Sequence, residues 1–157
     1  MREKRSALKC RIAAICILLF SEVVNAAGPD CSDINSWPTQ MTANALSNFG
    51  IKSEAVEFEK TRTDLLLSEK ITQKEAKALV KREVERARRV GLVNNAHLFD
   101  DIYLSQPIYK QIYRIQFMDK SKQSFHFMTT TLASDEECSI SIEGVAYINE
   151  ELLWPFK

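Results

Sequence analysis

The sequence predicts an α+β domain in which an N-terminal helix packs on a four-stranded antiparallel sheet, with an extra helix inserted between the first and second strands. Three observations predict this fold. Apolar and polar residues alternate over 109–148, a shorter run at 61–71 has the same period, and a helical pattern precedes and follows that shorter run. Because an antiparallel sheet with one apolar face needs a cover, we expect the helices to supply it.

The clearest strand pattern is a β-meander over 109–148. A polar turn at 119–123 joins its first two strands, and a loop at 133–137 joins the second to a third that starts near Cys138. Gly144 indicates a bulge or bend in that last strand. The residues expected on one side of the first two strands are Tyr109, Gln111, Tyr113, Ile115, Phe117, Phe125, Phe127, Thr129 and Thr131.

The first helix is predicted after Ser36, which occupies an N-cap position, with Pro38 tolerated in the first turn. Gly50 stands where a left-handed residue would end this helix. The apolar residues spaced four apart, which we expect to pack on the sheet, are Trp37, Met41, Ala45 and Phe49.

The run at 61–71 predicts a fourth strand, with Thr61, Thr63, Leu65 and Leu67 on one side. Thr72 and Glu75 then form a capping box that opens the inserted helix, which we expect to reach Val90 and end at Gly91. Its apolar line consists of Ala76, Val80, Val84 and Ala87. The following stretch, 92–104, is expected to be a connection with at most a helical turn.

The first 26 residues are predicted to be a cleaved signal peptide, which leaves 27–157 as a single domain. Five basic residues precede a nine-residue apolar run, and Ala26 ends a segment suited to signal-peptidase cleavage. That run is too short for a bilayer core of roughly 30 Å, so an uncleaved anchor is the less favoured alternative. We therefore expect an exported protein without a membrane anchor after cleavage.

Cleavage would leave Cys31 and Cys138 as the two remaining cysteines, and an oxidising compartment favours a disulfide between them. A shared metal site is the alternative, but the short ligand spacings of zinc modules are missing. The whole chain has 21 basic and 21 acidic residues, and the signal peptide carries more bases than acids. The mature protein is thus slightly acidic, which gives no indication of a nucleic-acid partner.

No motif in the sequence predicts a cofactor, a metal site or catalysis. His97 lies beside apolar neighbours in the connection, where packing is the expected role, and His126 alternates with two phenylalanines and faces away from them. The triplet Asp135, Glu136 and Glu137 lacks the spaced ligands and the turn glycine of a calcium loop. Paired carboxylates of the glycosidase kind stay open, because their spacing is three-dimensional. We expect a protein that is not an enzyme.

Two short segments resemble a group of small exported proteins of Gram-negative bacteria, some of which look like immunity partners of secreted antibacterial toxins. The segments are Asp30-Cys31 with 35–39, and 133–139 around Cys138. The resemblance covers the first helix, the strand at 61–71 and the meander, and it leaves out the helix that starts after Thr72. It implies a two-cysteine periplasmic domain and assigns no functional residue.

The leading hypothesis is a protein-binding module that inhibits or neutralises an exported toxin or envelope enzyme. A small envelope enzyme and a carrier that encloses an apolar ligand between helix and sheet are the alternatives. Surfaces suited to a protein partner are an acidic loop, a basic helix face and an apolar C-terminal tail. The residues predicted to bind the partner are Asp135, Glu136, Glu137, Arg82, Arg86, Arg89 and Trp154.

Overall fold

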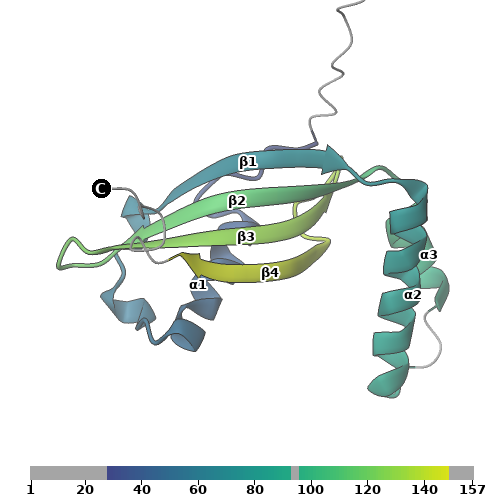
Figure 1. Cartoon of the computed structure of the whole chain (residues 1–157), viewed down its shortest axis with the longest axis horizontal. Helices are drawn as coiled ribbons and strands as arrows, with labels where there is room; N and C mark the ends of the chain where they lie inside the picture. Colours follow the sequence, from purple (N-terminus) through teal and green to yellow (C-terminus); the bar gives the residue numbers. More distant parts are fainter. Residues whose placement is uncertain (1–27, 93–95, 149–157) are drawn as a thin grey trace, which may run out of the picture.

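An antiparallel sheet of four strands dominates the described part of the chain, residues 28–92 and 96–148 of a computed structural model (Figure 1). The strands neighbour one another in chain order: β1 (Arg62–Lys70), β2 (Ile108–Met118), β3 (Ser124–Ser134) and β4 (Ser141–Ile148). α1 (Trp37–Ala45) packs on one face, here called the inner face. α2 (Gln73–Arg89) and α3 (Ala96–Leu104) are inserted between β1 and β2. The predicted fold class is confirmed.

The core lies between the inner face and the N-terminal segment. β2 and β3 pair in register from Ile108 with Ser134 to Met118 with Ser124, so the predicted alternation is confirmed over both strands. The side chains of Tyr113, Ile115, Phe117 and Phe127 are fully buried. Four large side chains on one face of a central strand pair account for much of the apolar area that folding removes from water.

The face of α1 that meets the sheet differs from the predicted one. Pro38, Thr39 and Thr42 are the buried residues of this helix. In the predicted stripe, Trp37, Met41 and Ala45 are only half-buried, and Phe49 is exposed. The Thr39 hydroxyl hydrogen-bonds to that of Thr63 at 2.8 Å, and the Thr42 hydroxyl to that of Thr129 at 2.7 Å. Because buried hydroxyls that pair cost little, the threonines can face the sheet instead of the apolar stripe.

The ends of α1 follow the prediction. Ser36 is its N-cap residue, although the Ser36 hydroxyl donates to the Cys31 carbonyl instead of accepting from the helix. A 3₁₀ turn (Leu46–Phe49) extends the helix, and Gly50 then takes a positive φ of 76°. The Ile51 amide donates to the Leu46 carbonyl at 3.1 Å, which closes the turn.

β1 contains a bulge that the alternation did not predict. Leu65 pairs with Tyr113 and Leu67 with Ile112, so Leu66 is the extra residue. The bulge moves Leu67 away from the inner face, where it had been expected, and leaves it 42% exposed. Leu67 lies instead on the opposite face of the sheet, here called the outer face. A similar irregularity in β4 separates Ile142 from Gly144, which confirms the bend expected there.

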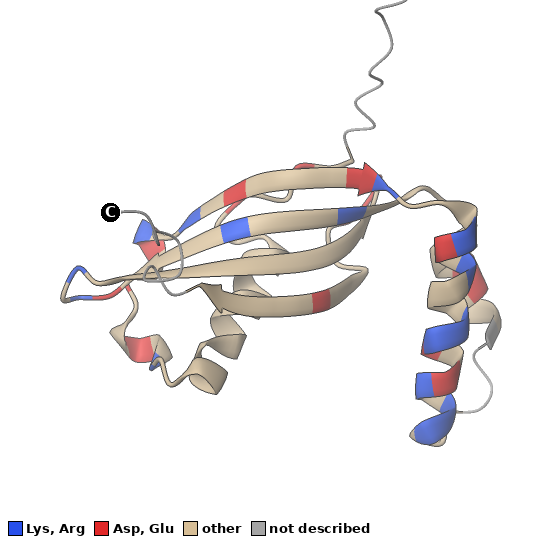
Figure 2. Cartoon of the chain, in the orientation of Figure 1, with Lys and Arg blue, Asp and Glu red and all other residues tan. Residues whose placement is uncertain are grey.

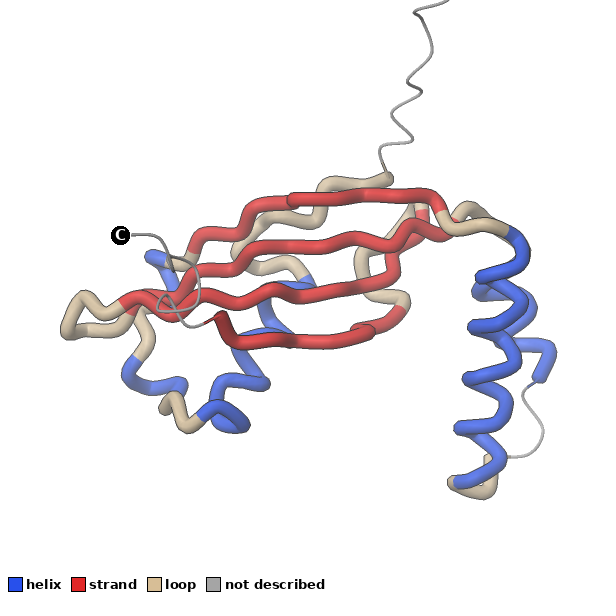
Figure 3. Tube along the Cα trace, viewed as in Figure 1, coloured by secondary structure: helices blue, strands red, loops and turns tan. Residues whose placement is uncertain are grey.

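α2 and α3 pack against each other and form an arm at one end of the sheet (Figures 1 and 3). The predicted capping box of Thr72 and Glu75 opens α2, and Gly91 follows its end with a φ of 80°. The segment 92–104 is not a mere connection, because Ala96–Leu104 is a helix. Its residues Phe99, Ile102 and Tyr103 pack in a cluster with Leu79 and Val80 of α2, and this burial stabilises a segment whose sequence pattern is too short to predict a helix.

The predicted disulfide between Cys31 and Cys138 is present, with a Cα–Cα distance of 5.9 Å. It ties the segment before α1 to the loop between β3 and β4. Cys31 is buried, and its amide donates to the Tyr113 hydroxyl at 3.3 Å. The signal peptide and the apolar tail with Trp154 lie outside the described residues.

Candidate functional site: a groove between α2 and the sheet

A groove of about 430 Å³ separates α2 from the outer face of the sheet. Its apolar lining comes from Ile71, Ala78 and Leu79 on the arm side and from Leu132 on β3. Four charged side chains surround this lining: Glu75, Arg82, Lys110 and Glu143. An apolar floor with a charged rim is the composition of a recognition site.

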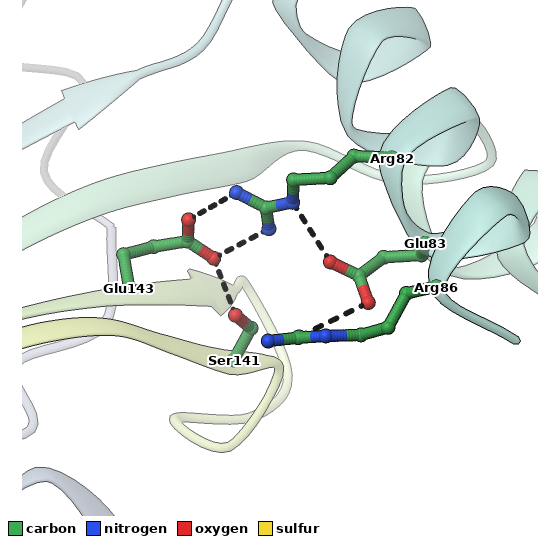
Figure 4. Close-up of polar contacts among 5 residues, drawn as sticks. All are labelled: Arg82, Glu83, Arg86, Ser141 and Glu143. Carbon is green, nitrogen blue, oxygen red and sulfur yellow. Dashed lines mark hydrogen bonds and ion pairs between the residues drawn. The ribbon is translucent and has the colours of Figure 1, made fainter. Parts of the chain in front are cut away.

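An ion pair between Arg82 and Glu143 spans the groove from α2 to β4 (Figure 4). Two guanidinium nitrogens donate to the two carboxylate oxygens at 2.5 and 2.8 Å, and the Ser141 hydroxyl donates to the same carboxylate at 2.5 Å. Arg82 also donates to Glu83 at 2.9 Å, and Glu83 accepts from Arg86 at 3.5 Å. Bidentate pairs of this kind fix geometry as well as charge, so this network links α2 to β4 in a defined orientation.

The network shifts the pKa values of both partners. The hydrogen bonds from Arg82 hold the pKa of Glu143 below its usual value, and the same contact raises the pKa of Arg82. A carboxyl group whose folded-state pKa is lowered stabilises the fold above its unfolded-state pKa. That contribution is lost as the pH falls through the folded-state value.

We expect Glu143→Gln to reduce the acid sensitivity of the protein. Urea unfolding of the wild type should show a falling free energy of unfolding below the ordinary glutamate pKa of 4.5, and the variant should show a smaller fall. The difference should stay below about 1 kcal/mol, because Arg82 is half-exposed and water screens the pair. Equal pH profiles for the two proteins would contradict this assignment.

The three arginines predicted to bind a partner all form ion pairs with glutamates of α2. Other cations of this helix do not. Arg82 and Arg86 share Glu83, and Arg89 pairs with Glu85 at 3.2 Å. On another side of α2, four exposed cations have no ion pair with any described residue, and we call them the basic stripe: Lys74, Lys77, Lys81 and Arg88. Their spacing of three, four and seven residues places them along one line of the helix. Figure 2 shows that Lys and Arg are concentrated on α2, with Asp and Glu between them.

The predicted acidic loop lies at the end of the sheet where the arm begins. Asp135, Glu136 and Glu137 are all exposed. The Ser134 hydroxyl accepts hydrogen bonds from the amides of Glu136 and Glu137 at 3.3 and 3.2 Å. The next residue, Cys138, forms the disulfide. A hydrogen bond to Asp135 raises the pKa of Tyr109, whose side chain belongs to the inner face. The loop is thus constrained, and it lies toward the face opposite the groove.

The two histidines differ in their surroundings. His97 is exposed on α3, so the expected packing role was wrong. His126 pairs with Ile148 on the outer face, away from the buried Phe127, as the alternation predicted. Among residues 28–92 and 96–148, no group of three or more His, Cys, Asp or Glu side chains could hold a metal ion.

No motif or periodicity in the sequence predicts the groove itself. Lys110 and Thr130 have the pattern of ordinary strand residues, and Gly144 was predicted only as a bulge or bend. The arm packs beside all three and so brings them into one site. The accessible signal was Glu143, the single charged residue of this strand, whose carboxylate could accept hydrogen bonds from a cation on another element.

Within the described residues, no helix has the length and apolar character needed to cross a membrane. No family model, no curated protein and no solved structure matches the chain.

Proposed function

We propose that this protein is an exported protein-binding module that inhibits or neutralises a secreted toxin or an envelope enzyme. The observation that carries the proposal is the open groove between the arm and the outer face. Its aliphatic floor suits an apolar anchor from a partner, while its charged rim suits polar contacts around that anchor.

The exposed surfaces around the groove support a protein partner. The outer face carries Leu67 at 42% exposure, with Ile112 and Met128 half-buried. The basic stripe lies on the same arm and offers four cations that form no ion pair within the described part of the chain. A one-signed line of charge steers an oppositely charged protein and raises the association rate.

The disulfide supports an extracytoplasmic location. Structural disulfides persist in oxidising compartments and are rare in the cytosol. Together with the predicted signal peptide, the bond between Cys31 and Cys138 favours export to the periplasm.

The proposal is tested with the mature chain as bait against periplasmic extract and against exported toxins of the same cell. A true partner must be bound and its activity inhibited. We expect reversal of Lys77 and Lys81 to glutamate to slow association roughly tenfold at low salt and to leave the thermal unfolding unchanged. The effect should shrink as salt screens the wild-type attraction.

Reversal of Glu136 and Glu137 to lysine is the matched control, because both residues are exposed and lie toward the opposite face. If this variant alone slows association, the acidic loop is the contact surface and the basic stripe only faces water. If the wild type neither binds nor inhibits any of the exported proteins, the proposed function is wrong.

A carrier of a small apolar ligand is the second candidate, and the volume of the groove favours it. Ligand pockets commonly occupy roughly 300–1,000 Å³, and the groove falls within that range. The predicted place for such a ligand, between the first helix and the sheet, is filled by buried side chains. Saturable binding of a fatty acid, abolished by Leu79→Glu, would favour the carrier.

A further inference from the structure

Along its length, α2 approaches β2, β3 and β4 in turn. Glu75 and Lys110 of β2 line the groove and interact electrostatically, Ala78 and Leu79 face Thr130 and Leu132 of β3, and Arg82 is paired with Glu143 of β4. These residues lie on one side of the helix, since they are spaced three or four apart.

The spacing of these contacts matches the spacing of the strands. From Glu75 to Arg82 the helix advances seven residues, which is about 10.5 Å at 1.5 Å per residue. From β2 to β4 the sheet advances two strand spacings, or roughly 9.5 Å. One turn of α2 therefore has about the same length as the spacing between neighbouring strands.

The helix continues after the sheet has ended. α2 reaches Arg89, seven residues beyond the one that contacts β4, and Figure 1 shows it extending past that strand. Seven more residues correspond to about two further strands. Arg86 and Arg89 lie on the side of α2 that carries Arg82, at the positions where a fifth and a sixth strand would lie.

Within the residues that the structure describes, the edge of β4 that faces away from β3 is open to pairing. Among the described residues, no backbone hydrogen bond from another segment reaches 141–148 on the side away from β3. Its single charged residue is Glu143, which is already bound to Arg82. The other edge, β1, carries Arg62, Asp64, Glu69 and Lys70, and charges of this kind discourage strand addition.

We propose that the edge of β4 and the overhanging part of α2 together bind an extended segment of the partner protein as a fifth strand. This inference rests on the proposed function and specifies how the partner docks. The added strand pairs its backbone with β4 and presents a carboxylate to Arg86, as Glu143 does to Arg82. Arg86 is 77% exposed, and its pair with Glu83 spans 3.5 Å, so it is available for a second carboxylate.

Charge argues for a partner instead of a second copy of this chain. Besides Glu143, whose carboxylate is already bound by Arg82 of its own copy, the outer-face residues of a second β4 are Ser141, Gly144, Ala146 and Ile148, none of which is acidic.

The test uses the full mature chain, labelled with ¹⁵N, and two synthetic nine-residue peptides. The first is Val-Glu-Val-Thr-Val-Thr-Val-Glu-Val, which presents a glutamate to the arm in either strand direction. The second has lysine in place of both glutamates. We expect the acidic peptide to shift the amide signals of 141–148, to leave those of β1 unchanged, and to bind roughly tenfold more tightly than the basic peptide.

Arg86→Glu should reverse this preference, while Arg62→Glu, an exposed arginine on β1, should leave it unchanged. Unchanged β4 signals at millimolar peptide, equal shifts at both edges, or equal affinities of the two peptides would each overturn the inference. So would a wild-type dimer with β4 at its interface. Peptide binding without any captured toxin would keep the strand site and refute the proposed partner class, whereas a captured toxin without peptide binding would do the reverse.

Discussion

Cys138→Ser is expected to lower the free energy of unfolding by about 2–5 kcal/mol, the usual cost of losing a native disulfide in a small exported domain. The two cysteines are 107 residues apart, so the bond restricts a long loop of the unfolded chain. The variant would also leave an unpaired Cys31 thiol buried in the core, in the segment before α1. Urea unfolding at constant pH measures the loss.

Reduction of the wild type with a thiol reagent serves as the control for that substitution. Reduced wild type and Cys138→Ser should unfold at similar urea concentrations, because both lack the same covalent bond. The neighbouring Ser139→Ala should behave as the oxidised wild type, since Ser139 is exposed. A variant as stable as the oxidised wild type would show that the bond contributes nothing measurable.

Phe127→Ala should be destabilising by about 3–5 kcal/mol, the range found when a buried aromatic side chain is removed. Phe127 is fully buried, and its ring centroid lies 5.8 Å from that of Phe117, 5.4 Å from that of Phe49 and 5.2 Å from that of Tyr147. Its loss removes one member of three aromatic pairs and leaves a cavity at the centre of the sheet.

Thr130→Ala is the matched control for Phe127→Ala. It lies on the same strand, three residues away, but faces the groove on the outer side. Chemical denaturation should place this variant within about 0.5 kcal/mol of the wild type, as for most substitutions outside the core. A loss at Thr130 as large as that at Phe127 would contradict the assignment of the core to the inner face.

The strands, the disulfide and the helix caps could be predicted because each depends on local or pairwise rules. Alternation over β2 and β3 is long enough to define which face is buried, and the two cysteines left after the predicted cleavage have no other partner. The capping box at Thr72 is a contact between residues three apart, so the sequence contains all of it.

The predictions that were wrong concern features determined by contacts between residues far apart in the sequence. The buried face of α1 is polar because Thr42 finds Thr129, 87 residues away, and no helical periodicity reports such a partner. One extra residue in β1 sends Leu67 to the outer face, and the alternating pattern continues without a visible break. The candidate site has the same origin, since Arg82 of α2 and Glu143 of β4, which pair across the groove, are 61 residues apart in the sequence.

The two hydroxyl pairs under α1 also determine how this helix can sit. A helix held only by aliphatic side chains can rotate by a fraction of a turn and recover most of its contacts, because dispersion attraction has little directional preference. Thr39 and Thr42 reach two different strands, β1 through Thr63 and β3 through Thr129. A rotation of α1 would break both bonds and leave the fully buried Thr129 hydroxyl without its partner on the helix, at a cost of about 1–3 kcal/mol. The two bonds therefore favour one rotation of α1 about its own axis. Through Thr129 they also link the N-terminal part of the chain to its C-terminal part.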